Sequence, residues 1–305
     1  MNRREFIASA AALAAGPTLA NCSGSACGAG SSGCSGRILF GVCRPPKDVP
    51  LLKSVGYDFF EYAVAPALGP DKDGEWWKKQ RDMLLGLPLP MRSCNGFIPG
   101  TFRLTGPKAD QGPALDYAEI ALRRADEVGV KTIVFGSGGA RNVPGDFTGP
   151  RDQQPKLEEG TRQYTEFCRA LCKRVADLKT TCVVIEPLRP NESNIINFVW
   201  HGVQICHDVN SPRLQQLADL FHMMMGRECA DSLVKAGPLL KHCHIASYET
   251  RQYPGSDPAT VDRLRPYFDA LHTIGYTGGV SCECGWGKGD FAKNLETALC
   301  TLRSL

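Results

Sequence analysis

The sequence predicts an α/β protein that forms a single-domain (β/α)8 barrel, the TIM barrel. From Arg37 onward, short apolar runs that end in polar or Gly-rich loops alternate with longer segments of helical periodicity, which is typical of repeated βα units around a parallel sheet. Eight such units occur and no block is duplicated, which favours a closed barrel over an open doubly wound sheet. A chain of 305 residues suits one barrel without a second domain.

The eight units are assigned in chain order. The expected strands are residues 38–43, 59–64, 91–97, 132–135, 181–188, 214–221, 240–246 and 279–284. The expected helices are residues 46–55, 74–86, 112–128, 157–179, 194–209, 227–236, 258–274 and 290–303. In such barrels the chemistry lies where strands end and the following loops begin, because the eight loops converge at that rim. Polar residues at the carboxyl ends of strands are therefore the candidate site residues.

The charge balance argues against a nucleic-acid-binding protein. The chain has 35 Lys and Arg against 32 Asp and Glu, a net charge of +3, dispersed along its length. This is too weak for a nucleic-acid track or an anionic membrane patch and suits a small-molecule ligand. Fourteen cysteines show no disulfide framework. Several of them lie inside expected strands, where we expect small buried apolar residues, among them Cys182, Cys243, Cys282 and Cys284.

The amino terminus has the features of an export signal. Arg3-Arg4 precedes an apolar run over residues 8–20 that contains no charge. This pattern predicts a twin-arginine export signal over residues 1–21, and the run is too short to span a bilayer stably. We therefore expect an exported protein that is periplasmic or attached to the cell envelope.

A low-complexity segment separates the signal from the barrel. Residues 22–36 are nearly all Gly, Ser, Ala and Cys, which predicts a flexible tether and places the barrel at residues 37–305. Cys22 follows a sequence similar to a lipoprotein box, so lipidation at Cys22 stays open as the one route to a membrane. A homo-oligomer is also left open.

Four potential metal ligands fall at the ends of the last four expected strands: Glu186, Asp219, His244 and Glu283. Among the other strand ends, the second offers a comparable group, Glu61. A lone strand-end carboxylate often caps a helix, but four ligands at the same end of consecutive strands indicate a shared site. Three carboxylates and one imidazole suit Mn²⁺ best, with Mg²⁺ or Co²⁺ as alternatives, rather than a thiolate-bound structural zinc.

Four motifs surround these residues. They are Ile185-Glu186-Pro187-Leu188 with Glu192, Asp219-Leu220-Phe221-His222-Met223, His244-Ile245-Ala246 with Arg251, and Tyr276-Thr277-Gly278-Gly279 before Glu283. They resemble the motifs of the xylose isomerase-like superfamily, the sugar phosphate isomerases and epimerases, and especially its D-tagatose and D-psicose 3-epimerase branch. With weaker likeness at residues 134–141, the resemblance covers roughly residues 37–303.

The resemblance implies roles for seven residues. The residues that would bind one divalent metal are Glu186, Asp219, His244 and Glu283, and those that would contact the sugar are Glu192, His222 and Arg251. His222 could instead orient a ligand. The chain departs from the branch at Arg189-Pro190, where Asn-Arg is usual, and at Trp286 after the last glutamate. These departures bear on the substrate more than on the metal.

Such a site is suited to moving a proton next to a sugar carbonyl. Removing that proton leaves an enediolate, which a divalent metal stabilises as a Lewis acid. Two carboxylates on opposite faces of the sugar could act as base and acid, and we assign Glu186 and Glu283 to this pair. Deprotonation on one face and reprotonation on the other gives epimerisation. Because phosphorylated sugars are scarce outside the cytoplasm, a non-phosphorylated ketose is expected.

Three alternatives stay open. The same site would act as a 3-keto-glycoside 1,2-lyase if the carbonyl lay at C3 of a glycoside and the group on C1 were expelled. An endonuclease IV-like nuclease shares the barrel but needs further His and Asp ligands, where this chain has Asn95 and Gly136. A non-catalytic sugar-binding barrel is also compatible with the fold.

Overall fold

The computed structural model describes residues 36–145, 147 and 155–305. The expected export signal over residues 1–21, Cys22 and nearly all of the expected tether over residues 22–36 lie outside the described residues. These expectations therefore stay predictions.

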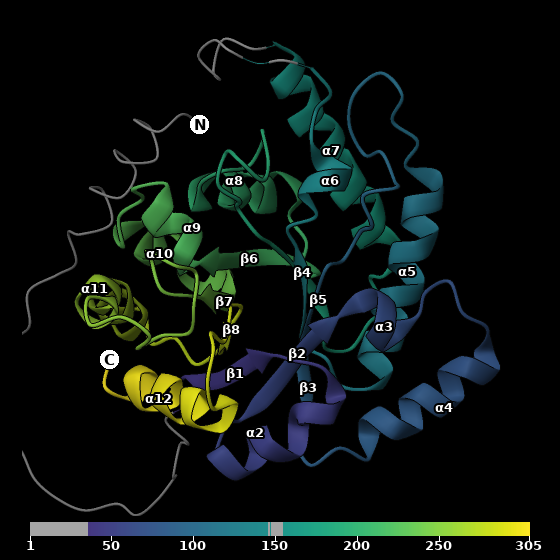
Figure 1. Cartoon of the computed structure of the whole chain (residues 1–305). Coiled ribbons are helices and arrows are strands. Elements are labelled where there is room, and N and C mark those ends of the chain that lie inside the picture. The colour runs from purple at the N-terminus through teal and green to yellow at the C-terminus, as the bar shows by residue number, and fades with distance from the viewer. Residues whose placement is uncertain (1–35, 146, 148–154) are drawn as a thin grey trace, which may run out of the picture.

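Eight parallel strands close into one barrel (Figure 1). The strands are β1 (Leu39–Cys43), β2 (Phe59–Ala63), β3 (Met91–Asn95), β4 (Thr132–Phe135), β5 (Cys182–Ile185), β6 (Leu214–Asp219), β7 (Leu240–Ile245) and β8 (Gly279–Cys282). Each pairs with its neighbours in the chain, and β1 pairs with β8 to complete the ring. All eight carboxyl ends therefore meet at one rim. The predicted single-domain TIM barrel is confirmed.

Helices surround the barrel (Figure 1). They are α2 (Val49–Val55), α3 (Val64–Leu68), α4 (Gly74–Leu85), α5 (Gly112–Glu127), α6 (Gly138–Arg141), α7 (Pro155–Arg174), α8 (Val199–Val209), α9 (Leu220–Met225), α10 (Asp231–Ala236), α11 (Thr260–Thr273) and α12 (Phe291–Arg303). The long helices bury one face: in α5, Ala114, Ala118, Ala121 and Ala125 recur at helical spacing and are buried. Among the described residues, no helix is long and apolar enough to cross a membrane.

The expectation of a strand up to residue 221 was wrong. β6 ends at Asp219, and the apolar segment that follows is the short helix α9. The Asp219 carboxylate accepts the backbone N–H of Phe221 at 2.8 Å and of His222 at 3.3 Å, so it begins the helix as an N-cap. Because α9 is buried over most of its surface, its apolar residues have no helical periodicity that sequence could show.

Three other expected strands run two or more residues past their true ends. β3 ends at Asn95 rather than at residue 97, because Gly96 turns the chain with a φ of 60°. β5 ends at Ile185 rather than at residue 188, because Pro187 has no N–H for a strand ladder. β8 ends at Cys282, which leaves Cys284 half-buried beyond the strand, whereas Cys182, Cys243 and Cys282 are buried within theirs.

The expected helix from residue 194 was also too long, since α8 begins at Val199. The preceding segment is a packed loop. Asn197 Nδ2 donates to the backbone oxygens of Leu188 at 2.6 Å and Ser193 at 2.7 Å, and Ile196 has a φ of 56°. A left-handed conformation is uncommon for a β-branched residue, so surrounding contacts hold this loop in place.

Asp126 joins the segment before β5 to α5. Its carboxylate accepts the backbone N–H of Lys179 at 3.1 Å, of Thr180 at 2.9 Å and of Thr181 at 3.0 Å. Burial opposes ionisation, but these donors prevail and lower the pKa of Asp126 to about 2. A carboxyl group with a depressed pKa stabilises the fold above its unfolded pKa of about 4, and this contribution is lost as the pH falls toward about 2.

We expect Asp126→Asn to lower the free energy of unfolding by about 1 kcal/mol at neutral pH, because a neutral amide replaces a charged acceptor of three N–H groups. Urea unfolding followed by circular dichroism measures this. The difference between the two proteins should shrink between about pH 4 and about pH 2 as the native carboxylate is protonated. A difference that does not vary with pH would contradict this account.

Candidate metal centre and active site

The four predicted ligands lie together at the carboxyl rim. Asp219 ends β6, His244 lies near the end of β7, and Glu186 and Glu283 directly follow β5 and β8. One ligand atom of each lies within 4.8 Å of the others. Ligands on opposite sides of one divalent cation lie about 4 to 5 Å apart, given metal–oxygen distances of about 2.0 to 2.5 Å. The spacing of the cluster therefore fits one ion.

The negative charge of the three carboxylates in the cluster also suits a bound cation. His244 and Asp219 are buried, and Glu186 keeps 7% of its side-chain surface exposed, whereas Glu283 keeps 26%. Three carboxylates at this spacing repel one another when ionised, and burial makes each charge more costly. A divalent cation between them would remove this repulsion. Because Glu283 is the most exposed of the four, the site opens to solvent on its side.

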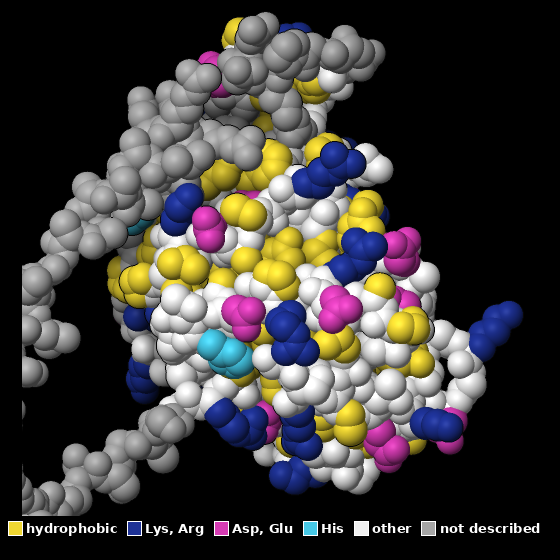
Figure 2. All heavy atoms as spheres, turned by 90° about the vertical axis from the view of Figure 1, so that its left-hand side faces the viewer, with side chains coloured by type: hydrophobic (Ala, Val, Ile, Leu, Met, Phe, Trp, Pro, Cys, Tyr) yellow, Lys and Arg dark blue, Asp and Glu magenta, His cyan; other side chains and the backbone are white. Residues whose placement is uncertain are grey.

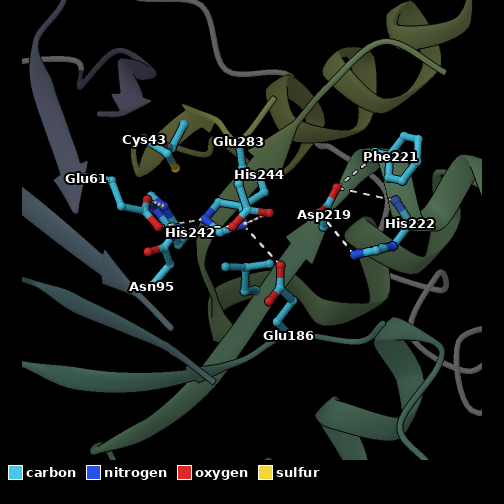
Figure 3. A network of polar contacts seen from close by, with 12 residues as sticks. Cys43, Glu61, Asn95, Glu186, Asp219, Phe221, His222, His242, His244 and Glu283 are labelled. Carbon is cyan, nitrogen blue, oxygen red and sulfur yellow. Dashed lines mark hydrogen bonds and ion pairs between the residues drawn. The ribbon is translucent and has the colours of Figure 1, made fainter. Parts of the chain in front are cut away.

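A line of contacts runs from Glu61 through His244 to Glu186 (Figure 3). His244 Nε2 lies 2.9 Å from Glu61 Oε1, and His244 Nδ1 lies 3.0 Å from Glu186 Oε1. His242 Nε2 contacts the other Glu61 oxygen at 2.8 Å. Burial alone would raise the pKa of Glu61, but the two imidazoles outweigh it and hold that pKa below its usual value. Glu61 is thus a buried carboxylate between two histidines.

The two predicted catalytic carboxylates have pKa values shifted in opposite directions. Burial raises the pKa of Glu186, and the charges of Glu283 and Asp219 add to the rise while His244 opposes it. Burial also acts upward on Glu283, but His244 and Arg251 outweigh it and lower the pKa of Glu283. Environments that separate two carboxyl pKa values leave one group able to hold a proton and the other able to accept one.

The three predicted substrate-binding residues lie beside the four ligands. Arg251 Nη1 donates to Glu192 Oε1 at 3.0 Å, and its Nη2 donates to Glu283 Oε2 at 3.3 Å. Arg251 has a φ of 52°, a strained conformation of the kind that concentrates at functional sites. His222 is buried, and neither ring nitrogen has a hydrogen-bond partner among the described residues. Such an imidazole is suited to bind a polar ligand.

The departures from the 3-epimerase motifs lie at the mouth of this site. The guanidinium of Arg189 lies 5.1 Å from the centroid of the Phe221 ring, and that of Arg251 lies 4.8 Å from it. Trp286 stacks on Tyr253 with ring centroids 5.7 Å apart. Cation–π and stacking contacts of this kind hold the planar groups in fixed orientations.

Sequence reasoning missed the roles of three further residues. Asn95 Nδ2 donates to Glu283 Oε1 at 3.1 Å, and the buried Arg141 donates from Nη1 to the backbone oxygen of Glu186 at 2.9 Å. A Cβ atom at Gly136 would lie 2.2 Å from Glu186 Oε2, so a glycine leaves room for that carboxylate. Asn95 could have been found as a polar strand end. The role of Arg141 could not have been found, because no local sequence pattern shows which atoms a side chain on a four-residue helix contacts.

Comparison with known proteins agrees with the barrel fold. The family described as "Xylose isomerase-like TIM barrel" matches residues 49–305. D-psicose 3-epimerase of Agrobacterium fabrum is 32% identical over 100 residues, which are 32% of this chain and 33% of that protein. A probable ketose 3-epimerase of Synechocystis is 26% identical over 171 residues, 56% of this chain and 55% of that protein. The chain thus aligns with about a third to about half of the length of these curated relatives.

The fold likeness extends further than the sequence likeness. The crystal structure of a 3-keto-D-glucoside 4-epimerase from E. coli superposes with a TM-score of 0.72, covering 88% of this chain and 100% of that one. The two sequences are 22% identical, so this similarity supports the barrel alone.

Arg141 connects three segments at the rim. Besides Glu186 O, its guanidinium reaches Phe135 O at 3.1 Å, Ser193 Oγ at 3.1 Å and Ile196 O at 3.3 Å. We expect Arg141→Met to lower the free energy of unfolding by about 3 kcal/mol or more, because these buried acceptors lose their donor. Arg141→Lys, which keeps the charge without the planar fork, should recover only part of the loss in urea unfolding. Full recovery by lysine would show that the fork is not required.

Proposed function

This chain belongs to the xylose isomerase-like TIM barrel family, and we propose that it is a divalent-metal-dependent sugar isomerase or epimerase. In its most specific form, the proposal is a 3-epimerase that acts on a non-phosphorylated ketose by proton abstraction next to the carbonyl, through an enediolate. The observation that carries the proposal is the cluster of Glu186, Asp219, His244 and Glu283. The curated relatives, named as a D-psicose and a ketose 3-epimerase, support the same reaction class.

The two carboxylates at this cluster are suited to acid–base work. A divalent cation, for which Mn²⁺ is the first candidate and Mg²⁺ and Co²⁺ the alternatives, would supply Lewis-acid stabilisation of charge on the sugar oxygens. We propose Glu283 as the base that removes the proton and Glu186 as the acid that returns one, because both carboxylates reach the position shared by the four ligand atoms. Asn95 and Arg251 each bond one oxygen of Glu283 and so orient its carboxylate.

The proposed substrate contacts come from three side chains. Arg251 and Glu192, bonded to each other, present a guanidinium and a carboxylate beside Glu283, where they can bind sugar hydroxyls. Neither nitrogen of the His222 ring is hydrogen-bonded within the described part of the chain, and its Nε2 lies 3.5 Å from Asp219 Oδ2. His222 can therefore contact a sugar oxygen next to the metal position.

The nuclease alternative has less support. A histidine at position 136 would carry a Cβ atom 2.2 Å from Glu186 Oε2, so it could not be added without moving a proposed ligand. On the face shown in Figure 2, basic and acidic side chains are interspersed rather than gathered by sign. A nucleic-acid track requires clustered positive charge. We propose a small sugar as the partner and no nucleic acid.

Cellular location is proposed from the sequence alone. Arg3-Arg4 and the apolar run after it support twin-arginine export and a periplasmic or envelope-anchored enzyme. Export favours a sugar without phosphate as the substrate.

Proton NMR in heavy water tests the reaction. With ketoses and 3-keto-glucosides offered in parallel to the manganese-loaded protein, we expect deuterium to enter a ketose as its C3 epimer forms. Glu283→Gln should reduce this exchange by about 10²- to 10⁴-fold, because an amide cannot remove the proton. Glu119→Gln, the same substitution on the outer helix α5, is the matched control and should leave the rate unchanged.

The same experiment separates the alternatives. Release of aglycone from a 3-keto-glucoside would establish the lyase instead of the epimerase. No turnover of either substrate panel by a metal-loaded protein would overturn the proposed substrate class and leave the metal site in place. A protein unable to bind manganese would favour a non-catalytic sugar-binding barrel.

Metal removal gives an independent prediction. We expect a chelator to abolish turnover and Mn²⁺ to restore it. Mn²⁺ at about a hundred times its Kd should stabilise the fold by about 2.7 kcal/mol, because it binds the native state and not the unfolded chain. Thermal unfolding measures the rise in Tm, which Glu186→Gln should reduce. A Tm that does not respond to Mn²⁺, Mg²⁺ or Co²⁺ would contradict the metal site.

A further inference from the structure

Glu61 is a buried carboxylate to which the proposed reaction assigns no role. It lies on β2 and is 0% exposed. Each of its oxygens contacts one imidazole: Oε1 faces His244 Nε2 at 2.9 Å, and Oε2 faces His242 Nε2 at 2.8 Å. Burying a carboxylate is costly unless it is paired and hydrogen-bonded, and these two histidines meet that requirement.

The contact with Glu61 decides which nitrogen of His244 would bind a cation. A carboxylate accepts hydrogen bonds and donates none, so the proton in each contact belongs to the imidazole. With a proton on Nε2, a neutral His244 carries its lone pair on Nδ1. Nδ1 lies on the side of the ring where the four ligand atoms meet, at hydrogen-bond distance from Glu186 Oε1, 3.0 Å, and 3.6 Å from Glu283 Oε2. A cation bound among these atoms would take the place of the proton in the contact between Nδ1 and Glu186.

His242 holds Glu61 in this position. His242 and His244 are two residues apart on β7, so their side chains leave the strand on the same side. The ring of His242 packs edge-on against Phe59, with centroids 6.1 Å apart, and against His244 at 5.2 Å. The Glu61 carboxylate is thus fixed by hydrogen bonds to two imidazoles that the same strand, β7, carries.

Cys43, Glu61 and His244 also bring ligand atoms within 4.8 Å of one another, but this group does not form a second metal site. Each oxygen of Glu61 already faces an imidazole nitrogen, at 2.8 and 2.9 Å, so this group offers an ion no carboxylate oxygen without a partner. Burial also raises the pKa of the Cys43 thiol well above its ordinary value, which disfavours the thiolate that a metal requires.

We propose that Glu61 is a positioning residue for the metal centre, which fixes His244 in the tautomer protonated on Nε2 so that Nδ1 binds the cation. This inference rests on the proposed metal function of the cluster of Glu186, Asp219, His244 and Glu283. A carboxylate behind a metal-bound histidine fixes the ring and raises its basicity, and losing it weakens metal affinity about 10- to 100-fold.

Titration calorimetry with Mn²⁺ on the full barrel tests the role. Glu61→Gln should raise the Kd about 10- to 100-fold, because an amide accepts from only one of the two imidazoles and presents an NH₂ group to the other. Ser93→Ala is the matched control. Ser93 pairs with Glu61 in the register of β2 and β3 and contacts Thr132 Oγ1 at 3.0 Å, so its loss removes a buried hydrogen bond without touching His244. Its Kd should equal that of the wild type.

Nitrogen NMR of the histidine rings in the Mg²⁺-loaded protein reads the tautomer directly. The chain has six histidines, so the His244 signals can be assigned with single substitutions. The wild type should show His244 protonated on Nε2, and Glu61→Gln should lose this preference. If Glu61→Gln does not fold, Glu61→Asp provides the test, since its shorter side chain keeps the charge but cannot reach both imidazoles.

The outcomes separate the two proposals. A wild-type protein that binds no divalent cation would overturn the proposed function itself. A wild type that binds Mn²⁺, together with Glu61 variants of unchanged Kd and unchanged His244 tautomer, would overturn the role of Glu61 and leave the metal site in place.

Discussion

Closure of the parallel sheet is the constraint on which the site depends. Pairing of β1 with β8 brings the carboxyl ends of all strands to one rim, where segments far apart in the chain become neighbours. The four proposed ligands come from or directly after β5, β6, β7 and β8, and each is held by a short buried strand. An open sheet with the same strands would not curve the ends of β5 to β8 around a single position.

His244 is the centre of the resulting electrostatic network. Its two ring nitrogens face carboxylates on opposite edges, Glu61 on one and Glu186 with Glu283 on the other. The site therefore concentrates negative charge around one imidazole inside a low-dielectric barrel, where each unpaired charge is costly. Binding a divalent cation on the Nδ1 side would neutralise the carboxylates there, while Glu61 keeps the opposite edge of the ring hydrogen-bonded.

Different contacts hold the inner side of the ligand cluster and the mouth of the site. Arg141 ties the end of β4 to Glu186 and to the packed loop before α8, and Gly136 leaves space for the Glu186 carboxylate. At the mouth, Arg189 and Arg251 lie over Phe221. The ligand cluster rests on strands and buried hydrogen bonds, whereas the mouth rests on loop side chains. Changes of substrate are therefore easier to accommodate there than changes of metal chemistry.

The sequence by itself determined the fold class, the eight strands and the four clustered residues, because strand periodicity and polar strand ends are local features. It did not reveal that Asp219 ends β6 by capping α9, since an apolar segment buried over most of its surface has no diagnostic period. Only the tertiary structure decided the pairing of Glu61 with His242 and His244 and the bond from Asn95 to Glu283. These contacts join strands that are distant in the chain, and they depend on register and barrel closure, which no local pattern encodes.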